Sequence, residues 1–421
     1  MANELGQKGN LLDTPELCAY YLNDRLLWRN LALIGLCNIG WSVATGITGP
    51  LMVLKLLEVG VTEGYQGVVG SVNSWLLSFL VMYFSWKSDH TVAKMGRRKP
   101  FLFLAAGPII LSTALFPVFH TPVPLVGLWL MMIMFGNMKA STFPLLNIDC
   151  VRRDMLARAQ SILRIANGLV MFGAMRLTPS LIDRAEWLPY VIGAALLTLS
   201  TVVAWWIKEP PISNPATHTF KPWSAIKIGI RDRRVIWLMV SIAMIASFES
   251  IYASWAWIWA KTTLGLDRND IFEAMSWASL VSTAIAFPVG WAIDKFGGFR
   301  VAIVYYFLML GNLIVVLNVH DAFTLTIFVV VMTIAAPLND GVEIMLYKTA
   351  DPKEVGSIIS SLSFFRNLYG GTLLFCTGLL IEFTNRNYSV IFIMGSVLMS
   401  IGLAVLLIYR RKMSGDKMEV I

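Results

Sequence analysis

Twelve stretches of this sequence are long and apolar enough to cross a lipid bilayer as helices. A membrane-spanning helix requires about 20 mainly apolar residues, and short polar breaks separate such stretches along the whole chain. Charged residues make up only 14% of the sequence, whereas a soluble domain carries roughly 25%. We therefore predict an all-α integral membrane protein. Its predicted spans are 29–57, 66–86, 100–119, 123–150, 158–180, 187–207, 235–259, 271–293, 301–318, 322–347, 356–381 and 388–409.

The longest polar break, 208–234, lies between the sixth and seventh spans. It contains the Pro210–Pro211 pair, which cannot continue a helix. We interpret it as a cytoplasmic linker between two six-helix bundles, with a short surface helix around 223–230. The predicted organisation is a cytoplasmic N-terminal segment at 1–28, an N-terminal bundle at 29–207, the linker at 208–234, a C-terminal bundle at 235–409 and a cytoplasmic tail at 410–421.

The positions of the basic residues orient the predicted helices. With the N-terminus in the cytoplasm, 25 of the 34 Lys and Arg residues lie in cytoplasmic segments, five lie within spans and four lie in external loops. Because cytoplasmic loops are enriched in Lys and Arg, we predict that both termini are cytoplasmic, in a bacterial inner membrane or a plasma membrane. This distribution also accounts for the net charge of +8 without a nucleic-acid partner. The four external basic residues are Arg184, Lys261, Arg268 and Arg386.

The sequence lacks several patterns that would indicate other classes of protein. The first ten residues lack the basic-then-apolar pattern of a cleaved signal peptide. The four cysteines form no C-x-x-C pair, and the four histidines lie in loops or near span ends, so we predict no metal site, no cofactor and no enzymatic activity. The G-x-x-x-x-G-K-[ST] loop that cradles phosphates is also missing, which argues against ATP-driven transport by this chain.

Two loops on the predicted cytoplasmic side carry the same order of residues: an acid at a helix end, a glycine and then arginine. One copy alone would be typical of a basic membrane anchor, but two copies half a chain apart indicate a duplicated six-helix unit. The carboxylate can pair with arginine on a neighbouring helix or cap its N-terminus, so we predict a conformational latch. The latch residues are Asp89, Gly96, Arg97 and Arg98 in the first loop and Asp294, Gly297 and Arg300 in the second.

Both loops resemble the conserved loop motif of the major facilitator superfamily. The long spacing of the first copy, from Asp89 to the run at 96–101, is similar to that of the glycoside–pentoside–hexuronide:cation symporters and, more closely, of the sucrose transporter group. Gly40-Trp41 and Gly49-Pro50 in the first span strengthen this resemblance. The resemblance implies two pseudo-symmetric six-helix bundles, a sugar or glycoside as the solute, and coupling to protons or sodium.

The resemblance also carries expectations about individual positions. Asp149 is similar to the aspartate in the fourth helix of sucrose transporters. Sodium-coupled members of the wider family place carboxylates in the second helix, where this chain has Leu77 and Val81. This departure favours protons over sodium and leaves open a carrier that has lost coupling.

Polar side chains inside the spans mark the predicted solute pathway, because charges in hydrocarbon are costly and usually face the bundle interior or a wet cavity. Polar contacts between packed helices are the alternative explanation. Lys139 near the middle of the fourth span is the least expected; it could pair with Glu249 or bind an anionic group such as that of a sugar acid. The predicted substrate-binding residues are Asn38, Trp41, Thr45, Lys139, Asn167, Tyr252, Trp255, Arg366 and Asn367, of which Tyr252 or Trp255 could stack on a sugar ring.

Carboxylates inside the spans are the predicted proton carriers. Glu249 lies roughly 20 Å from the cytoplasmic end of the seventh span at about 1.5 Å per residue, where burial favours proton uptake. Asp340 or Glu343 is expected to pair with Arg366, either for coupling or as a structural ion pair. The predicted proton-coupling residues are Glu249, Asp149, Asp340, Glu343 and Arg164.

Together these features predict a monomeric secondary active transporter that carries a small solute with H⁺ across the lipid bilayer by alternating access. The solute is expected to be a sugar, glycoside or sugar acid. An exporter of small metabolites or drugs and an uncoupled facilitator are the main alternatives. An exporter would favour a larger and more apolar cavity than these charges indicate. A receptor that binds solute without moving it is a further alternative of a different class.

Overall fold

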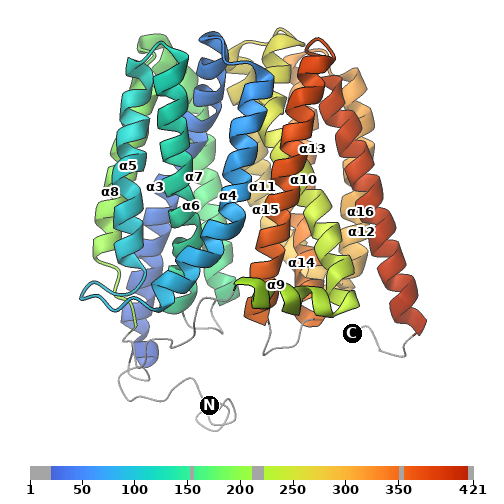
Figure 1. The fold of residues 1–421 in the computed structure, drawn as a ribbon. Helices are drawn as coiled ribbons and strands as arrows, with labels where there is room; N and C mark the ends of the chain where they lie inside the picture. Colours follow the sequence, from blue (N-terminus) through green and yellow to red (C-terminus); the bar gives the residue numbers. More distant parts are fainter. Residues whose placement is uncertain (1–19, 152–155, 211–221, 350–354, 416–421) are drawn as a thin grey trace.

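The structure is a computed structural model that describes residues 20–151, 156–210, 222–349 and 355–415, and these residues form a bundle of long helices without strands (Figure 1). In chain order the helices are α3 (Asp24–Glu58), α4 (Glu63–Asp89), α5 (Lys99–Leu115), α6 (Pro122–Cys150), α7 (Leu156–Arg184), α8 (Leu188–Trp205), α9 (Pro222–Arg231), α10 (Arg233–Thr262), α11 (Arg268–Phe296), α12 (Gly298–Val315), α13 (Ala322–Ala335), α14 (Asp340–Thr349), α15 (Val355–Phe383) and α16 (Ser389–Gly415). Short 3-10 turns, η1 (Phe116–Val118), η3 (Val316–Asn318) and η4 (Ala336–Asn339), follow α5, α12 and α13.

Within the described residues, eleven helical segments are long and apolar enough to cross a membrane. α11 is not one of the eleven. It nevertheless has 29 residues, as α6 and α7 have, and it packs against α7 and α13. The twelve predicted spans therefore correspond to these eleven segments together with α11, which runs beside them through the bundle (Figure 1).

The tenth predicted span, 322–347, is not one continuous helix. α13 ends at Ala335, η4 makes a 3-10 turn, and α14 starts again at Asp340. Pro337 lies in this turn, and proline interrupts a helix because it lacks an N–H and clashes with the preceding turn. The predicted span agrees with the candidate span Ala322–Leu346, but the α-helix within it is interrupted. The break places Asp340 and Glu343 in the first turn of a new helix, where the backbone N–H groups lack intrahelical partners.

The ends of the helices are set by local chemistry. The Thr62 hydroxyl accepts a hydrogen bond from the backbone N–H of Tyr65 and caps α4, and Asp232 caps α10 in the same way. Gly297 separates α11 from α12 with φ +82°, a conformation that favours glycine. The predicted surface helix in the linker is confirmed as α9, which packs against α10 and α15.

Two groups of helices enclose separate hydrophobic cores. One core is built from α3 and α5–α8 and contains Ile34 and Ile109. Another is built from α10–α16 and contains Phe248, Tyr305 and Phe328. We call α3–α8 the N-terminal bundle and α10–α16 the C-terminal bundle. The separate cores support the predicted division on either side of 208–234, which remains an interpretation.

The two bundles meet along two seams, where α4 packs against α15 and α7 packs against α11. At the first seam the backbones are in contact: a Cβ added to Gly67 would lie 3.1 Å from the Cα of Gly378. Small residues allow such close approach between membrane helices. At the second seam the Ser279 hydroxyl donates to the carbonyl of Gly168 at 2.9 Å.

The loops fall at two ends of the bundle. One end carries α9, the start of α3 and the end of α16, and we call it the α9 end (lower part of Figure 1). The other end carries the α3–α4, α10–α11 and α15–α16 connections, and we call it the opposite end (Figure 1). The positive-inside rule predicts that the α9 end is cytoplasmic.

Candidate functional site

The first copy of the loop motif forms a network of ion pairs at the α9 end. The Arg98 guanidinium is buried, and it pairs with Asp89 at the end of α4 and, at 3.0 Å, with Asp149 at the end of α6. Arg97 pairs with the same Asp149 carboxylate at 2.7 Å. Burial opposes the charge on Arg97, but Asp149, Asp89 and Glu209 outweigh it and raise its pKa. The network therefore fastens the α4–α5 loop to α6 within one bundle.

Glu209, directly after α8, caps α5 from a distant part of the chain. Its carboxylate accepts hydrogen bonds from the backbone N–H groups of Arg97 at 2.7 Å, Arg98 at 3.1 Å and Lys99 at 2.9 Å. A carboxylate at a helix N-terminus satisfies N–H groups that have no partner inside the helix. A Cβ on Gly96 would lie 2.4 Å from Cδ of this carboxylate, and Gly96 has φ +108°. Glycine is therefore required here both for the turn and for the close approach of Glu209.

The second copy of the motif is built differently. Gly297 has the positive φ of its counterpart Gly96, but a Cβ there would meet no atom within 4 Å. Arg300 is exposed at the start of α12. The side chain of Asp294, near the end of α11, lies outside the described part of the structure. The repeated sequence motif thus shares its glycine geometry with the first copy, and the role of both copies as a conformational latch stays a prediction.

Three charged residues from three helices of the C-terminal bundle meet within the predicted spans. Arg366 of α15 lies 3.8 Å from Glu249 of α10 and 3.6 Å from Glu343 of α14. The predicted pairing of Glu343 with Arg366 is confirmed. The side chain of Arg366 is 43% exposed, that of Glu249 37% and that of Glu343 26%. All three are therefore only partly shielded from solvent. One guanidinium therefore contacts carboxylates from two other helices, and we call Glu249, Glu343 and Arg366 the charged trio.

Lys139 of α6 does not join this trio. Its Nζ lies 4.8 Å from the ring centroid of Trp41 on α3 and 4.8 Å from that of Phe143 on α6. Trp41 and Phe143 are buried in the core of the N-terminal bundle, and Lys139 is half-buried beside them. The alternative that Lys139 pairs with Glu249 is therefore wrong among the described contacts, because the lysine faces aromatic rings of its own bundle.

The aromatic residues predicted to stack on a sugar are packed against protein. Trp255 is 1% exposed and lies at the crossing of α4 and α15, where its ring is 3.3 Å from the position of a Cβ on Gly378. Tyr252 packs beside Phe248 and Phe328. A stacking role for either ring would require these contacts to open, and that role stays a prediction.

The other predicted site residues differ in how far their side chains are buried in the protein. Thr45 is exposed and hydrogen-bonds the carbonyl of Trp41 at 2.9 Å, and Asn38 is half-buried on the same helix. Asn167 of α7 and Asn367 of α15 are half-buried, and Oδ1 of Asn167 is buried without a hydrogen-bond partner among the described residues. The side chains of Arg164 on α7 and Asp340 on α14 lie outside the described part. Asp149 belongs to the network at the α9 end, so its proposed proton role would act there.

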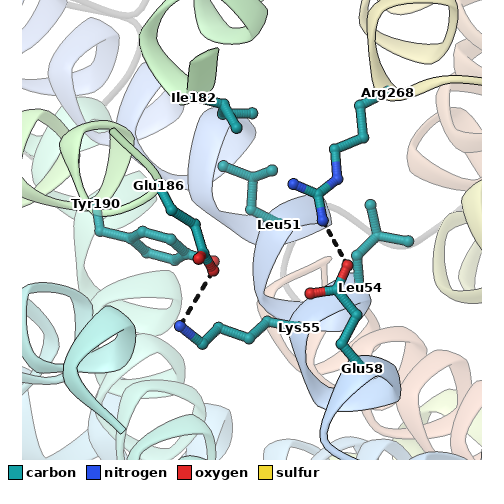
Figure 2. A pocket seen from close by; sticks show the side chains of 8 residues that line it. All are labelled: Leu51, Leu54, Lys55, Glu58, Ile182, Glu186, Tyr190 and Arg268. Carbon is teal, nitrogen blue, oxygen red and sulfur yellow. Dashed lines mark hydrogen bonds and ion pairs between the residues drawn. The ribbon is translucent and has the colours of Figure 1, made fainter. Parts of the chain in front are cut away.

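Ion pairs join the two bundles at the opposite end. Glu58, the last residue of α3, pairs with Lys261 at 3.0 Å and with Arg268, and Figure 2 shows the Arg268 contact across a small pocket. In the same view Lys55 of α3 pairs with Glu186 at 3.3 Å, within the N-terminal bundle. The pocket is lined by Leu51, Leu54, Lys55, Glu58, Ile182, Glu186, Tyr190 and Arg268.

A second contact at this end is better shielded from water. Glu63, the first residue of α4, is 4% exposed and accepts a hydrogen bond from the Tyr388 hydroxyl at 2.7 Å. The Arg386 guanidinium lies 3.3 Å from the same oxygen. Arg386 and its neighbour Asn385 both have positive φ values, of 65° and 54°, so an unusual turn presents the guanidinium to Glu63. The contacts of Glu58 and Glu63 hold the bundles together at the opposite end.

Three functional acids, Glu209, Glu58 and Glu63, were not predicted from the sequence. A signal existed for the last two. Three of the four external basic residues, Lys261, Arg268 and Arg386, pair with these acids. For Glu209 the signal was weaker, because it follows Lys208 at the start of the proline-containing linker and no spacing rule connects it to α5.

Comparison with known proteins identifies the family. The model of the Major Facilitator Superfamily matches residues 34–371, which is most of the chain. The protein belongs to this superfamily and is a multi-pass membrane protein of the transporter class. No curated protein sequence matches it significantly.

Solved structures of transporters share the fold. The structure of a mutant of the nucleoside transporter NupG is similar with a TM-score of 0.71 at 13% identity, covering 92% of this chain and 99% of that one. The human organic anion transporter MFSD10 (TETRAN) gives 0.68 at 12% identity, covering 90% and 99%. A bacterial homologue of the human lysosomal transporter Spinster, inward-facing and unoccupied, gives 0.66 at 13% identity, covering 97% and 100%. At these identities the likeness establishes the fold of two six-helix bundles and no substrate.

Proposed function

We propose that this protein is a proton-coupled symporter of a sugar or glycoside that works by alternating access. The observation that carries the proposal is the charged trio of Glu249, Glu343 and Arg366. Ionisable groups at membrane depth are rare and mark ion or solute pathways. Carboxylates at such positions form proton relays in pumps and transporters. Proton uptake would then change how tightly α10, α14 and α15 are held together.

The contacts at the opposite end support the alternating-access part of the proposal. Glu58 and Glu63 of the N-terminal bundle pair with residues of the C-terminal bundle, which keeps that end closed. A solute that enters from that end requires these contacts to break. Membrane carriers of this class move solute by rocking one bundle against the other around a site near the bilayer midplane.

The solute class rests on weaker support than the coupling. The sucrose-transporter resemblance of the first loop favours a sugar or glycoside, whereas the structural neighbours are a nucleoside transporter and an organic anion transporter by their titles. All of these solutes are small and polar, which fits a charged rather than an apolar pathway. An exporter of small metabolites or drugs and an uncoupled facilitator are the alternatives.

Uptake into liposomes tests the coupling. Purified protein should accumulate a labelled sugar when the lumen is made more alkaline than the outside, and a proton uncoupler should abolish accumulation. Glu249→Gln should reduce proton-driven accumulation at least tenfold but retain exchange of labelled for unlabelled sugar, which needs no net proton movement. Asp321→Asn, in an exposed loop where the amide keeps its bond to Thr324, is the matched control.

Equal accumulation with and without the gradient would indicate a facilitator. Accumulation in the reverse direction, from the lumen outward, would indicate an exporter. A Glu249→Gln variant that accumulates sugar as well as the unchanged protein does would remove Glu249 from the coupling step.

A further inference from the structure

Lys139 is a cation at membrane depth whose charge is not neutralised by a described carboxylate. It lies 11 residues before the end of α6 at Cys150, which is about 16 Å along the helix axis. Its recorded contacts are with the rings of Trp41 and Phe143. Among the described acidic side chains none forms an ion pair with it.

Two aromatic rings compensate this ammonium group only in part. A cation over an aromatic face is attracted by the ring quadrupole, and the attraction grows when water is excluded. Removing an ammonium from water nevertheless costs more than such contacts return, and a buried charge normally has a partner of opposite sign. Trp41 and Phe143 are fixed in the core, so they hold the ammonium in place. Lys139 itself is only half-buried, which leaves part of it accessible.

The C-terminal bundle holds carboxylates within the spans. Glu249 and Glu343 both lie close to the guanidinium of Arg366. Under the proposed function these carboxylates take up the proton. The ammonium of Lys139, in the other bundle, is then the group that can contact a negative charge on the solute.

We propose that Lys139 anchors a carboxylate of the transported solute, and that the sugar of the proposed function is a sugar acid with a single carboxylate. Trp41 and Phe143 position the ammonium, and the carboxylate supplies the missing counter-charge. This inference rests on the proposed function for the idea that solute enters between the bundles. It sharpens that function, because an anion and a proton that move together transfer no net charge.

Ligand-induced thermal stabilisation of the purified protein tests the site with matched pairs of compounds. Glucuronate with glucose and gluconate with glucitol each compare a carboxylate with a neutral hydroxyl compound of similar size. We expect at least one acid to stabilise the protein. Its neutral partner should need at least a tenfold higher concentration to give the same rise in melting temperature. If no acid binds, or if a neutral partner binds as tightly as its acid, the proposal is wrong.

Two variants separate binding from folding. Lys139→Met fills the same space without a charge, so it should leave the unliganded melting temperature unchanged or raise it while weakening binding of the acid at least tenfold. Lys139→Arg keeps the positive charge and should therefore bind the acid more tightly than Lys139→Met does. A lysine with a purely structural role would give the reverse pattern, with a lower melting temperature in Lys139→Met and unchanged acid binding.

The outcomes distinguish this proposal from the proposed function. Proton-driven accumulation of a neutral sugar that persists in Lys139→Met would overturn the anion site and leave proton coupling intact. Binding of an acid that depends on Lys139, without any effect of a proton gradient on its uptake, would establish the site and overturn proton coupling.

Discussion

The ion pairs at the two ends of the bundle differ in what they connect. At the α9 end, Arg97 and Arg98 join loop and helix ends that all belong to the N-terminal bundle. At the opposite end, Glu58 and Glu63 join the N-terminal bundle to the C-terminal bundle. Contacts inside one bundle persist when the bundles rock against each other, whereas contacts between bundles must break. The first network therefore contributes to stability, and the second set biases the conformational equilibrium.

The same contrast holds between the two copies of the loop motif. In the first copy a glycine, two arginines and the distant Glu209 form a closed set of contacts. In the second copy Gly297 keeps the backbone geometry, and Arg300 is exposed. A duplicated sequence motif thus does not imply a duplicated set of side-chain contacts. Substitutions at matched positions can measure how far the two copies have diverged.

The largest expected effect is that of Arg98→Ala. This change removes a buried guanidinium and leaves Asp89 and Asp149 without the counter-charge that holds them, so we expect a loss of about 3–5 kcal/mol of stability. The measurement is unfolding of the protein in detergent, followed by tryptophan fluorescence. Arg300→Ala is the matched control in the second copy and should change stability by less than about 0.5 kcal/mol, because the side chain is exposed. Equal losses in both variants would contradict the contrast between the copies.

A smaller effect is expected from alanine at the two motif glycines. Both have positive φ, so Gly96→Ala and Gly297→Ala should each cost about 1–3 kcal/mol from backbone strain. Gly96→Ala should cost more, because its Cβ would also displace the Glu209 carboxylate from the N-terminus of α5. The same unfolding measurement compares them, and Glu209→Gln in the Gly96→Ala background isolates the contribution of the cap. A larger loss at Gly297 would show that the close approach of Glu209 is unimportant.

The smallest effects on stability, but the clearest on conformation, are expected at the opposite end. Glu63→Gln removes the charge that a buried contact shares with Arg386, and it should increase opening of that end several-fold. Glu58→Gln breaks pairs that are more than a third exposed, so its effect should be smaller, about 0–1 kcal/mol, and should weaken with added salt. Distances between spin labels on the α3–α4 and α15–α16 loops measure the opening. If neither variant changes these distances, the pairs do not hold that end closed.

Parts of the fold followed from the sequence because they depend on local properties. The apolar lengths, the polar breaks and the glycine turns are all properties of neighbouring residues, and the helices follow them closely. The surface helix α9 was predicted. A pairing of Arg366 with Asp340 or Glu343 was also predicted, because charges at similar depth in the membrane have few other partners, and the structure shows it for Glu343. The interruption at Pro337 could have been predicted from the proline itself. It was not predicted, because the long apolar stretch around it indicated one continuous span.

The sequence by itself determined that the chain crosses the membrane many times, that it contains a repeated unit, and which few charged residues lie within lipid depth. Only the tertiary structure decided which of those charges meet. Arg366 contacts two carboxylates on other helices, and Lys139 contacts two aromatic rings in its own bundle. Glu209 accepts a hydrogen bond from the N-terminus of α5, more than a hundred residues away in the sequence. Helix periodicity fixes the face and depth of a side chain, but the rotation and crossing of neighbouring helices fix its partner, and those depend on packing between distant segments.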